Sequence, residues 1–93
     1  MAVTNRSLPE MFSYRPDVLR ELERHGIRPN SGTRPELVRD YVRELYKYEI
    51  RRLRGRVVAR EFPKSEYASR VDALRRQYLV LAVPARQFTV EDE

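Results

Sequence analysis

The fold follows most directly from residues 46–78, which read YKYEIRRLRGRVVAREFPKSEYASRVDALRRQY. Phe62-Pro63 separates two runs of helical periodicity here, because a proline pushes the residue before it out of the helical region. Both runs carry apolar residues at intervals of four, three and four, a spacing typical of the contact stripe of a coiled coil. The stripe residues are Tyr46, Ile50, Leu53 and Val57 before the break, and Tyr67, Val71, Leu74 and Tyr78 after it.

The residues of the two stripes lie at equal distances in sequence before and after Phe62. If the chain reverses there, each residue of the first stripe meets the residue of the second stripe that is equally far from Phe62. The sequence therefore predicts an antiparallel helical hairpin with four cross-helix pairs. These are Val57 with Tyr67, Leu53 with Val71, Ile50 with Leu74, and Tyr46 with Tyr78.

The ends of the helices are predicted from local signals. Thr33 followed by Glu36 has the spacing of a capping box, and Pro35 suits a first helical turn, so the long helix spans about 34–60 and its partner about 64–78. A shorter helix of about 16–25 begins near Pro16. It ends before Gly26, which suits a left-handed backbone position with Ile27 folding back onto the helix.

The short helix is predicted to pack at the base of the hairpin. The first half of the long helix has an apolar stripe of its own, formed by Val38, Tyr41, Val42 and Leu45, which is left free for the short helix. The fold class is therefore all-α, with residues 1–14 as an irregular lead-in, 15–83 as a single helical domain, and 84–93 as a disordered tail. Residues 79–83 fit either a last helical turn or an extended segment.

Composition narrows the class of protein. A chain of 93 residues without cysteine supports one small domain, no disulfide framework and no thiolate chemistry. The longest apolar run, Tyr78 to Val83, is much shorter than the ~18 residues that a membrane span needs. We therefore expect a cytoplasmic protein, without a membrane span and without a secretory signal at its N-terminus.

The positive charge of the chain is local. The net charge is +5, and residues 50–60 alone hold five arginines and no acid. These arginines, together with the nearby Lys47 and Tyr48, are the candidate residues for binding an anion or a protein partner. The arginines are Arg51, Arg52, Arg54, Arg56 and Arg60.

The basic segment has two interpretations. Its arginines could flank a buried stripe and pair with acids of the next helix, such as Glu66 and Asp72, or they could form an anion-binding surface. Helical spacing puts Arg52 and Arg56 on the flank of Glu49, so these three residues are the predicted structural salt bridge. Arg51 and Arg54 lie on the opposite flank and are the better candidates for contact with a partner.

Enzymatic chemistry has little support. His25 is the only histidine, and its place in the last turn of the short helix suits a cation at the negative end of the helix dipole. No carboxylates lie at metal-ligand spacing with a histidine, and no glycine-rich phosphate loop is present. We therefore predict no catalytic residue, no metal site and no cofactor.

The remaining classes of function differ in the kind of partner. The first is a helical adaptor that binds an acidic protein through the basic surface of the long helix, with a homo-oligomer also possible. The alternative is a nucleic-acid-binding module that contacts phosphates without sequence specificity through Arg51–Arg60. A membrane-surface helix is disfavoured, because it would insert the same apolar stripe that the hairpin uses.

Overall fold

The computed structural model describes residues 11–90 and is all-α, as predicted. Three α-helices are present in this range: α2 (Pro16–Glu23), α3 (Pro35–Val58) and α4 (Tyr67–Gln77). Short 3-10 helices lie before and after α4: η1 (Lys64–Glu66), η2 (Leu79–Ala82) and η3 (Ala85–Gln87). Residues 79–82 are thus helical rather than extended.

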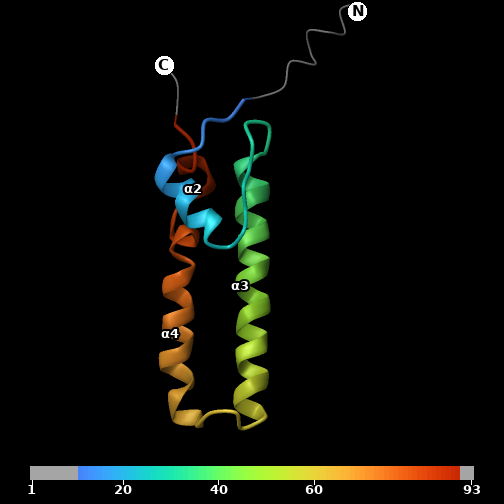
Figure 1. Cartoon of the computed structure of the whole chain (residues 1–93), viewed down its shortest axis with the longest axis vertical. Coiled ribbons are helices and arrows are strands. Elements are labelled where there is room, and N and C mark those ends of the chain that lie inside the picture. Colours follow the sequence, from blue (N-terminus) through green and yellow to red (C-terminus); the bar gives the residue numbers. More distant parts are fainter. Residues whose placement is uncertain (1–10, 91–93) are drawn as a thin grey trace, which may run out of the picture.

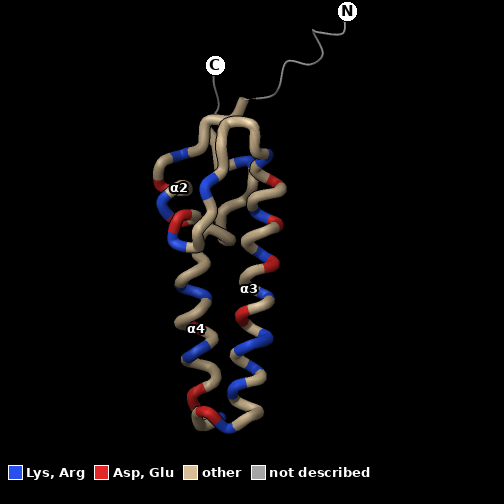
Figure 2. The backbone as a smooth tube through the Cα atoms, turned by 45° about the vertical axis from the view of Figure 1, so that its right-hand side comes forward, with Lys and Arg blue, Asp and Glu red and all other residues tan. Residues whose placement is uncertain are grey.

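The helices form an elongated structure (Figure 1). α3 and α4 lie side by side and run in opposite directions, and residues 59–63 connect them at one end. The second view, turned by 45°, shows the same pairing (Figure 2). α2 and the C-terminal segment lie together at the other end, beside the first part of α3. Half of the structure therefore has three layers of chain, and the other half has only two helices.

α2 begins at the predicted residue and has the predicted C-terminal motif, but it ends at Glu23 rather than at about residue 25. Pro16 is its first residue, and Gly26 has a φ of 76°. The Gly26 N–H donates to Glu23 O and the Ile27 N–H donates to Leu22 O, which together form a Schellman motif. Ile27 thereby folds back and packs against the core.

The start of α3 differs from the predicted capping box. Pro35 is the first helical residue, but the residue before it, Arg34, is the N-cap, and no side chain caps the helix. The Thr33 hydroxyl instead donates to Asn30 Oδ1 at 3.0 Å, and its oxygen accepts the Asn30 N–H. The capping box is wrong because Thr33 is used by the preceding turn, which competes for the same hydroxyl.

The end of α3 is a second Schellman motif, and its left-handed residue is not glycine. Arg60 has a φ of 63°, the Arg60 N–H donates to Val57 O, and the Glu61 N–H donates to Arg56 O. The helix therefore ends at Val58, a few residues before the Phe62-Pro63 break that predicted its end. An arginine in this conformation is strained, because its Cβ crowds the backbone.

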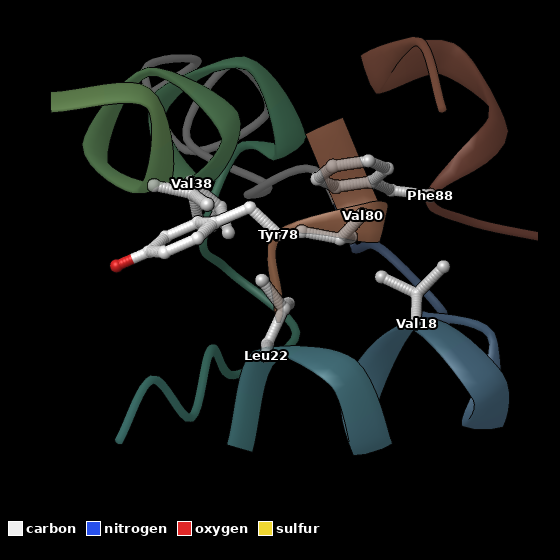
Figure 3. Close-up of a cluster of buried hydrophobic side chains, with 7 residues drawn as sticks. Val18, Leu22, Val38, Tyr78, Val80 and Phe88 are labelled. Carbon is white, nitrogen blue, oxygen red and sulfur yellow. The ribbon is translucent and has the colours of Figure 1, made fainter. Parts of the chain in front are cut away.

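The main core lies in the three-layered end (Figure 3). Its buried side chains come from α2, from the first half of α3 and from the segment after α4. They are Val18, Leu22, Val38, Val42, Tyr78, Val80 and Phe88. Partly buried neighbours include Leu45, Tyr46 and Leu74. Val38 and Val42 of α3 thus share one core with Val18 and Leu22 of α2, and at this end α3 packs mainly against the C-terminal segment that contains η2 and η3.

The predicted C-terminal tail of 84–93 is corrected for residues 84–90. Phe88 is 0% exposed, and Thr89 forms an isolated antiparallel bridge with Tyr14. The Arg15 N–H donates to Phe88 O, and the Val90 N–H donates to Ser13 O. The segment is ordered because a buried phenylalanine and these backbone bonds tie it to the lead-in. Residues 1–10 and 91–93 of the predicted lead-in and tail lie outside the described residues.

Two long polar side chains secure the same end of the molecule. Arg39 donates from Nε to Val83 O at 2.9 Å and from a terminal nitrogen to Leu81 O at 2.6 Å. This guanidinium satisfies the carbonyl of Leu81 in η2 and that of Val83 directly after it, which the end of a short helix leaves free. The Tyr14 hydroxyl donates to Thr33 O at 2.5 Å. Burial, with a smaller effect from Glu36, raises the pKa of Tyr14 to about 12.

The two-helix half has a thinner core. In this half only Leu53 and Phe62 are buried among the described residues. The other stripe residues of this half are partly exposed: Ile50, Val57, Tyr67, Val71 and Leu74. A pair of helices can bury only the line along which they touch, so both flanks of the apolar stripe remain open to solvent.

Candidate interaction surface

The basic surface lies on the second half of α3, where cationic segments predominate (Figure 2). Arg51, Arg54 and Arg60 are exposed, and none of them forms an ion pair with an acid of the described residues. Lys47 is also exposed but pairs with Glu44 at 3.4 Å. The structure thus leaves three guanidinium groups within ten residues available for an external anion.

Arg52 and Arg56 lie on the other flank of α3, as helical spacing predicts. They line a groove of about 290 Å³ that runs between α3 and α4, which we call the Arg52 groove. Its floor is apolar and its rim is charged. The lining residues are Glu49, Arg52, Leu53, Arg56, Arg70, Ala73, Leu74 and Gln77.

The cations of the Arg52 groove already have intramolecular partners. Arg56 pairs with Glu61 at 3.0 Å, and Arg70 pairs with Glu66 at 3.0 Å. The Arg70 guanidinium lies 4.0 Å from the centroid of the Phe62 ring, and that of Arg56 lies 5.5 Å from it. Such cation–π contacts stabilise the turn between the helices. The groove is therefore close to electrostatic balance, unlike the surface around Arg51 and Arg54.

The predicted salt bridge of Glu49 with Arg52 or Arg56 is wrong. Glu49 Oε2 accepts a hydrogen bond from the Tyr78 hydroxyl at 2.5 Å, and neither arginine is within ion-pair distance of it. Arg52 lies instead over the Tyr48 ring, 5.9 Å from its centroid. The correction has a geometric cause: α4 brings the buried Tyr78 hydroxyl to the carboxylate from a position 29 residues away, whereas the arginines extend outward along the groove.

His25 belongs to a cluster that sequence reasoning missed. Its ring stacks on Tyr78 with centroids 4.1 Å apart, and its Nε2 lies 2.7 Å from Gln77 O. Since a carbonyl oxygen only accepts, Nε2 carries the proton and donates. Burial, and then the hydrogen bond to Glu49, raise the pKa of Tyr78 above its ordinary value. His25 thus makes a structural contact that links the turn after α2 to the end of α4.

A second hollow adjoins the Arg52 groove and shares Glu49 and Gln77 with it. It has a volume of about 560 Å³, and its lining is mixed. The residues around it are Arg24, His25, Leu45, Glu49, Gln77 and Tyr78. No local pattern in the sequence indicates this cluster, because its members come from the turn after α2, from α3 and from the end of α4.

Of the two tyrosines of α3 that were expected in the core, one is partly buried and the other is exposed. Tyr46 is partly buried, and its ring centroid lies 5.2 Å from that of Tyr78, so it belongs to the core. Tyr41 was expected in the core but is 56% exposed, because the core cluster takes in Val38 and Val42 and leaves Tyr41 outside it. Tyr48 is 52% exposed and lies beside the basic surface.

No group of three or more histidine, aspartate or glutamate side chains in residues 11–90 could hold a metal ion. No helix in this range is long and apolar enough to cross a membrane.

The fold and the surface together define a small all-α protein whose longest helix carries a concentrated group of arginines. Comparison of the chain with family models, with curated proteins and with solved structures gives no match. What the protein does is therefore argued from its own residues.

Proposed function

We propose that the protein is a small, non-enzymatic, cytoplasmic helical adaptor that binds an acidic protein partner through the basic surface of α3. One observation carries this proposal: Arg51 and Arg54 are exposed and have no acidic partner among residues 11–90, whereas most other cations of α3 and α4 are paired. The proposed binding residues are Lys47, Tyr48, Arg51, Arg52, Arg54, Arg56 and Arg60, of which Arg52 and Arg56 lie on the flank of the Arg52 groove.

Unpaired arginines suit a binding role better than a stabilising one. Exposed ion pairs contribute only ~0–1 kcal/mol to stability, so an acid that paired with Arg51 would add little to the fold. The same charges, left free, steer an acidic partner toward the surface and disfavour basic competitors. Arginine also binds a carboxylate through two parallel hydrogen bonds (a bidentate contact), which fixes the orientation of the two groups.

The contacts of His25 support a non-enzymatic role. A general acid or base must present a free nitrogen to a substrate. His25 uses Nε2 for Gln77 O and stacks its ring face on Tyr78, so only its Nδ1 is left to face a substrate. The carboxylate of Glu49 is likewise engaged by Tyr78.

The supporting scaffold is the antiparallel hairpin with the register given above. In this register Leu53 meets Val71 and Ile50 meets Leu74, so the basic surface is held by a regular two-helix seam. The contact between the Tyr46 and Tyr78 rings agrees with the fourth pair.

Nucleic acid is the alternative partner, because phosphates are also anions that bind arginine in two-pronged geometry. If all five arginines of residues 50–60 contacted B-DNA, the log–log slope of affinity against salt would approach about −4 to −5. A protein partner with a few carboxylates gives a shallower slope. The salt slope therefore separates the two classes.

The experiment compares two charge reversals. The double variant Arg51→Glu/Arg54→Glu is expected to keep the melting temperature of the wild type and to lose the partner that co-purifies from the native host. Arg56→Glu is the matched comparison: it is expected to lower the melting temperature, because it removes the pair with Glu61 and the contact with Phe62. Recovery of nucleic acid alone, or of no partner at all, would contradict the proposal.

A further inference from the structure

The two-helix half of the molecule has two open flanks, and they differ in charge balance. The Arg52 groove is one flank, and its arginines at the rim are engaged by Glu61, by Glu66 or by aromatic rings. The other flank includes a shallow hollow of about 560 Å³ on α4. That hollow is lined by Tyr67, Ala68, Ser69, Val71, Asp72 and Arg75.

Helix geometry shows which residues of α3 belong to this second flank. Successive residues of an α-helix are rotated by about 100°. The Arg52 groove takes Arg52 and Arg56, so Ile50, Arg54 and Val57 lie on the other side of Leu53. In the same way, Arg70 and Ala73 lie in the groove, whereas Ala68 and Val71 lie on the other side of Leu74.

We call this second flank the Ala68 face. It consists of Ile50, Arg54 and Val57 from α3 and Tyr67, Ala68, Val71 and Arg75 from α4. Its centre is apolar and only partly buried. Two arginines lie at its edges: Arg54 has no acidic partner among residues 11–90, and Arg75 forms an exposed ion pair at 3.5 Å with Asp72, which lines the same hollow.

From this arrangement we infer that the partner presents an acidic amphipathic helix, which lies along the Ala68 face and completes a three-helix bundle. The inference rests on the proposed function and names the element that the basic surface binds. At the other end of α3, the C-terminal segment with η2 and η3, together with α2, already covers the apolar stripe. An incoming helix would bury the partly exposed valines against its own apolar stripe and place its acids opposite Arg54 and Arg75.

The dimensions and charges of the Ala68 face favour a partner helix over a second copy of the chain or a nucleic acid. The part of α3 from Tyr46 to Val58 has 13 residues, or about 20 Å at 1.5 Å per residue, which fits a partner helix of three to four turns. A second copy of the chain would bring Arg54 and Arg75 close to the same cations of its partner, and this repulsion disfavours a symmetric dimer. A nucleic acid would not need the apolar centre.

Two alanines of α4 provide a matched test. Ala68 lines the Ala68 face and Ala73 lines the Arg52 groove, and both are exposed residues of one helix. Ala68→Glu and Ala73→Glu therefore make the same chemical change on opposite flanks. The probe is a synthetic 18-residue helix with leucine at the a and d positions of its heptads and glutamate beside them. Its counterpart with lysine in place of glutamate is the charge control.

The full-length chain is expected to bind the glutamate helix and not the lysine helix, as measured by titration calorimetry. Ala68→Glu should weaken binding by at least tenfold, and Ala73→Glu should change it by less than twofold. Melting temperatures of both variants that equal that of the wild type would show that neither effect on binding is a loss of fold. Amide exchange of the wild-type complex should slow at Ile50, Val57 and Val71.

Three outcomes would overturn the inference, and they separate it from the proposed function. If Ala73→Glu is the variant that loses binding, the partner lies in the Arg52 groove and the adaptor proposal stands. If the chain alone is a dimer that Ala68→Glu dissociates, a second copy covers the face. If the glutamate helix does not bind and an oligonucleotide does, both the inference and the adaptor proposal fail.

Discussion

The Tyr78 hydroxyl donates a hydrogen bond to Glu49 Oε2 at 2.5 Å, and this contact joins the end of α4 to the middle of α3. It lies at the boundary between the three-layered core and the two-helix half. Tyr78 is 3% exposed, and its ring also contacts His25 and Tyr46. One side chain therefore connects α2, α3 and α4.

We predict that Tyr78→Phe destabilises the protein by about 1–3 kcal/mol, because it leaves a partly buried carboxylate without its donor. Glu49→Gln keeps an acceptor for the hydroxyl, and its cost should be smaller. Urea unfolding followed by circular dichroism measures both variants. A larger loss for Glu49→Gln than for Tyr78→Phe would mean that the carboxylate has another partner that matters more.

Stability should fall at alkaline pH through Tyr14. Its pKa is raised to about 12 in the folded protein, by burial first and Glu36 second, whereas an unfolded tyrosine titrates near its ordinary value of 10.0. A raised folded pKa contributes stability that is complete below about pH 10 and is lost as pH rises toward 12. In Tyr14→Phe, the free energy of unfolding should therefore depend less steeply on pH between 10 and 12. Tyr48→Phe, at an exposed ring, is the control and should leave the slope unchanged.

Replacing Arg60 with glycine should stabilise the protein by about 1 kcal/mol, because glycine adopts the left-handed conformation without steric cost. Arg60→Ala removes the same charge but keeps a Cβ, so it is the matched control and should give no gain. Thermal unfolding of both variants gives the comparison. A gain of equal size in Arg60→Ala would assign the effect to charge.

The corrected C-terminal segment can be tested at Phe88. Because its side chain is fully buried, Phe88→Ala should cost about 3–5 kcal/mol, a large share of the stability of so small a domain. Val90→Ala changes an exposed residue of the same segment and should cost less than about 0.5 kcal/mol. Similar melting temperatures for the two variants would show that the segment does not contribute to the core.

The hairpin seam is tested at Leu53, the buried residue of the two-helix half of α3. Leu53→Ala should destabilise by about 2–4 kcal/mol. Leu37→Ala, at an exposed position of the same helix, is the control with little expected effect. If α4 packed elsewhere, the cost at Leu53 would fall to that at Leu37.

Several features of the fold were predictable because they depend on short-range properties of the chain. Gly26 and Ile27 form the C-terminal motif of α2 that the local pattern indicates, since glycine alone adopts the left-handed backbone conformation without steric cost. The break at Phe62-Pro63 and the repeating apolar residues likewise predict two helices. The concentration of arginines in residues 50–60 is also a property of the sequence alone.

The remaining features were decided by tertiary structure, because they depend on which groups from distant segments meet. Helical spacing puts Arg52 and Arg56 on the flank of Glu49, yet Tyr78 provides its hydrogen bond. Phe88 lies within a polar C-terminal stretch, and only the space between α2 and α3 makes it a core residue. The sequence by itself determined the helices, their breaks and the place of the charge, since periodicity and backbone preference act over a few residues. The pairing of side chains was decided only in the folded structure, where the rotation of each helix about its axis sets which polar group lies nearest.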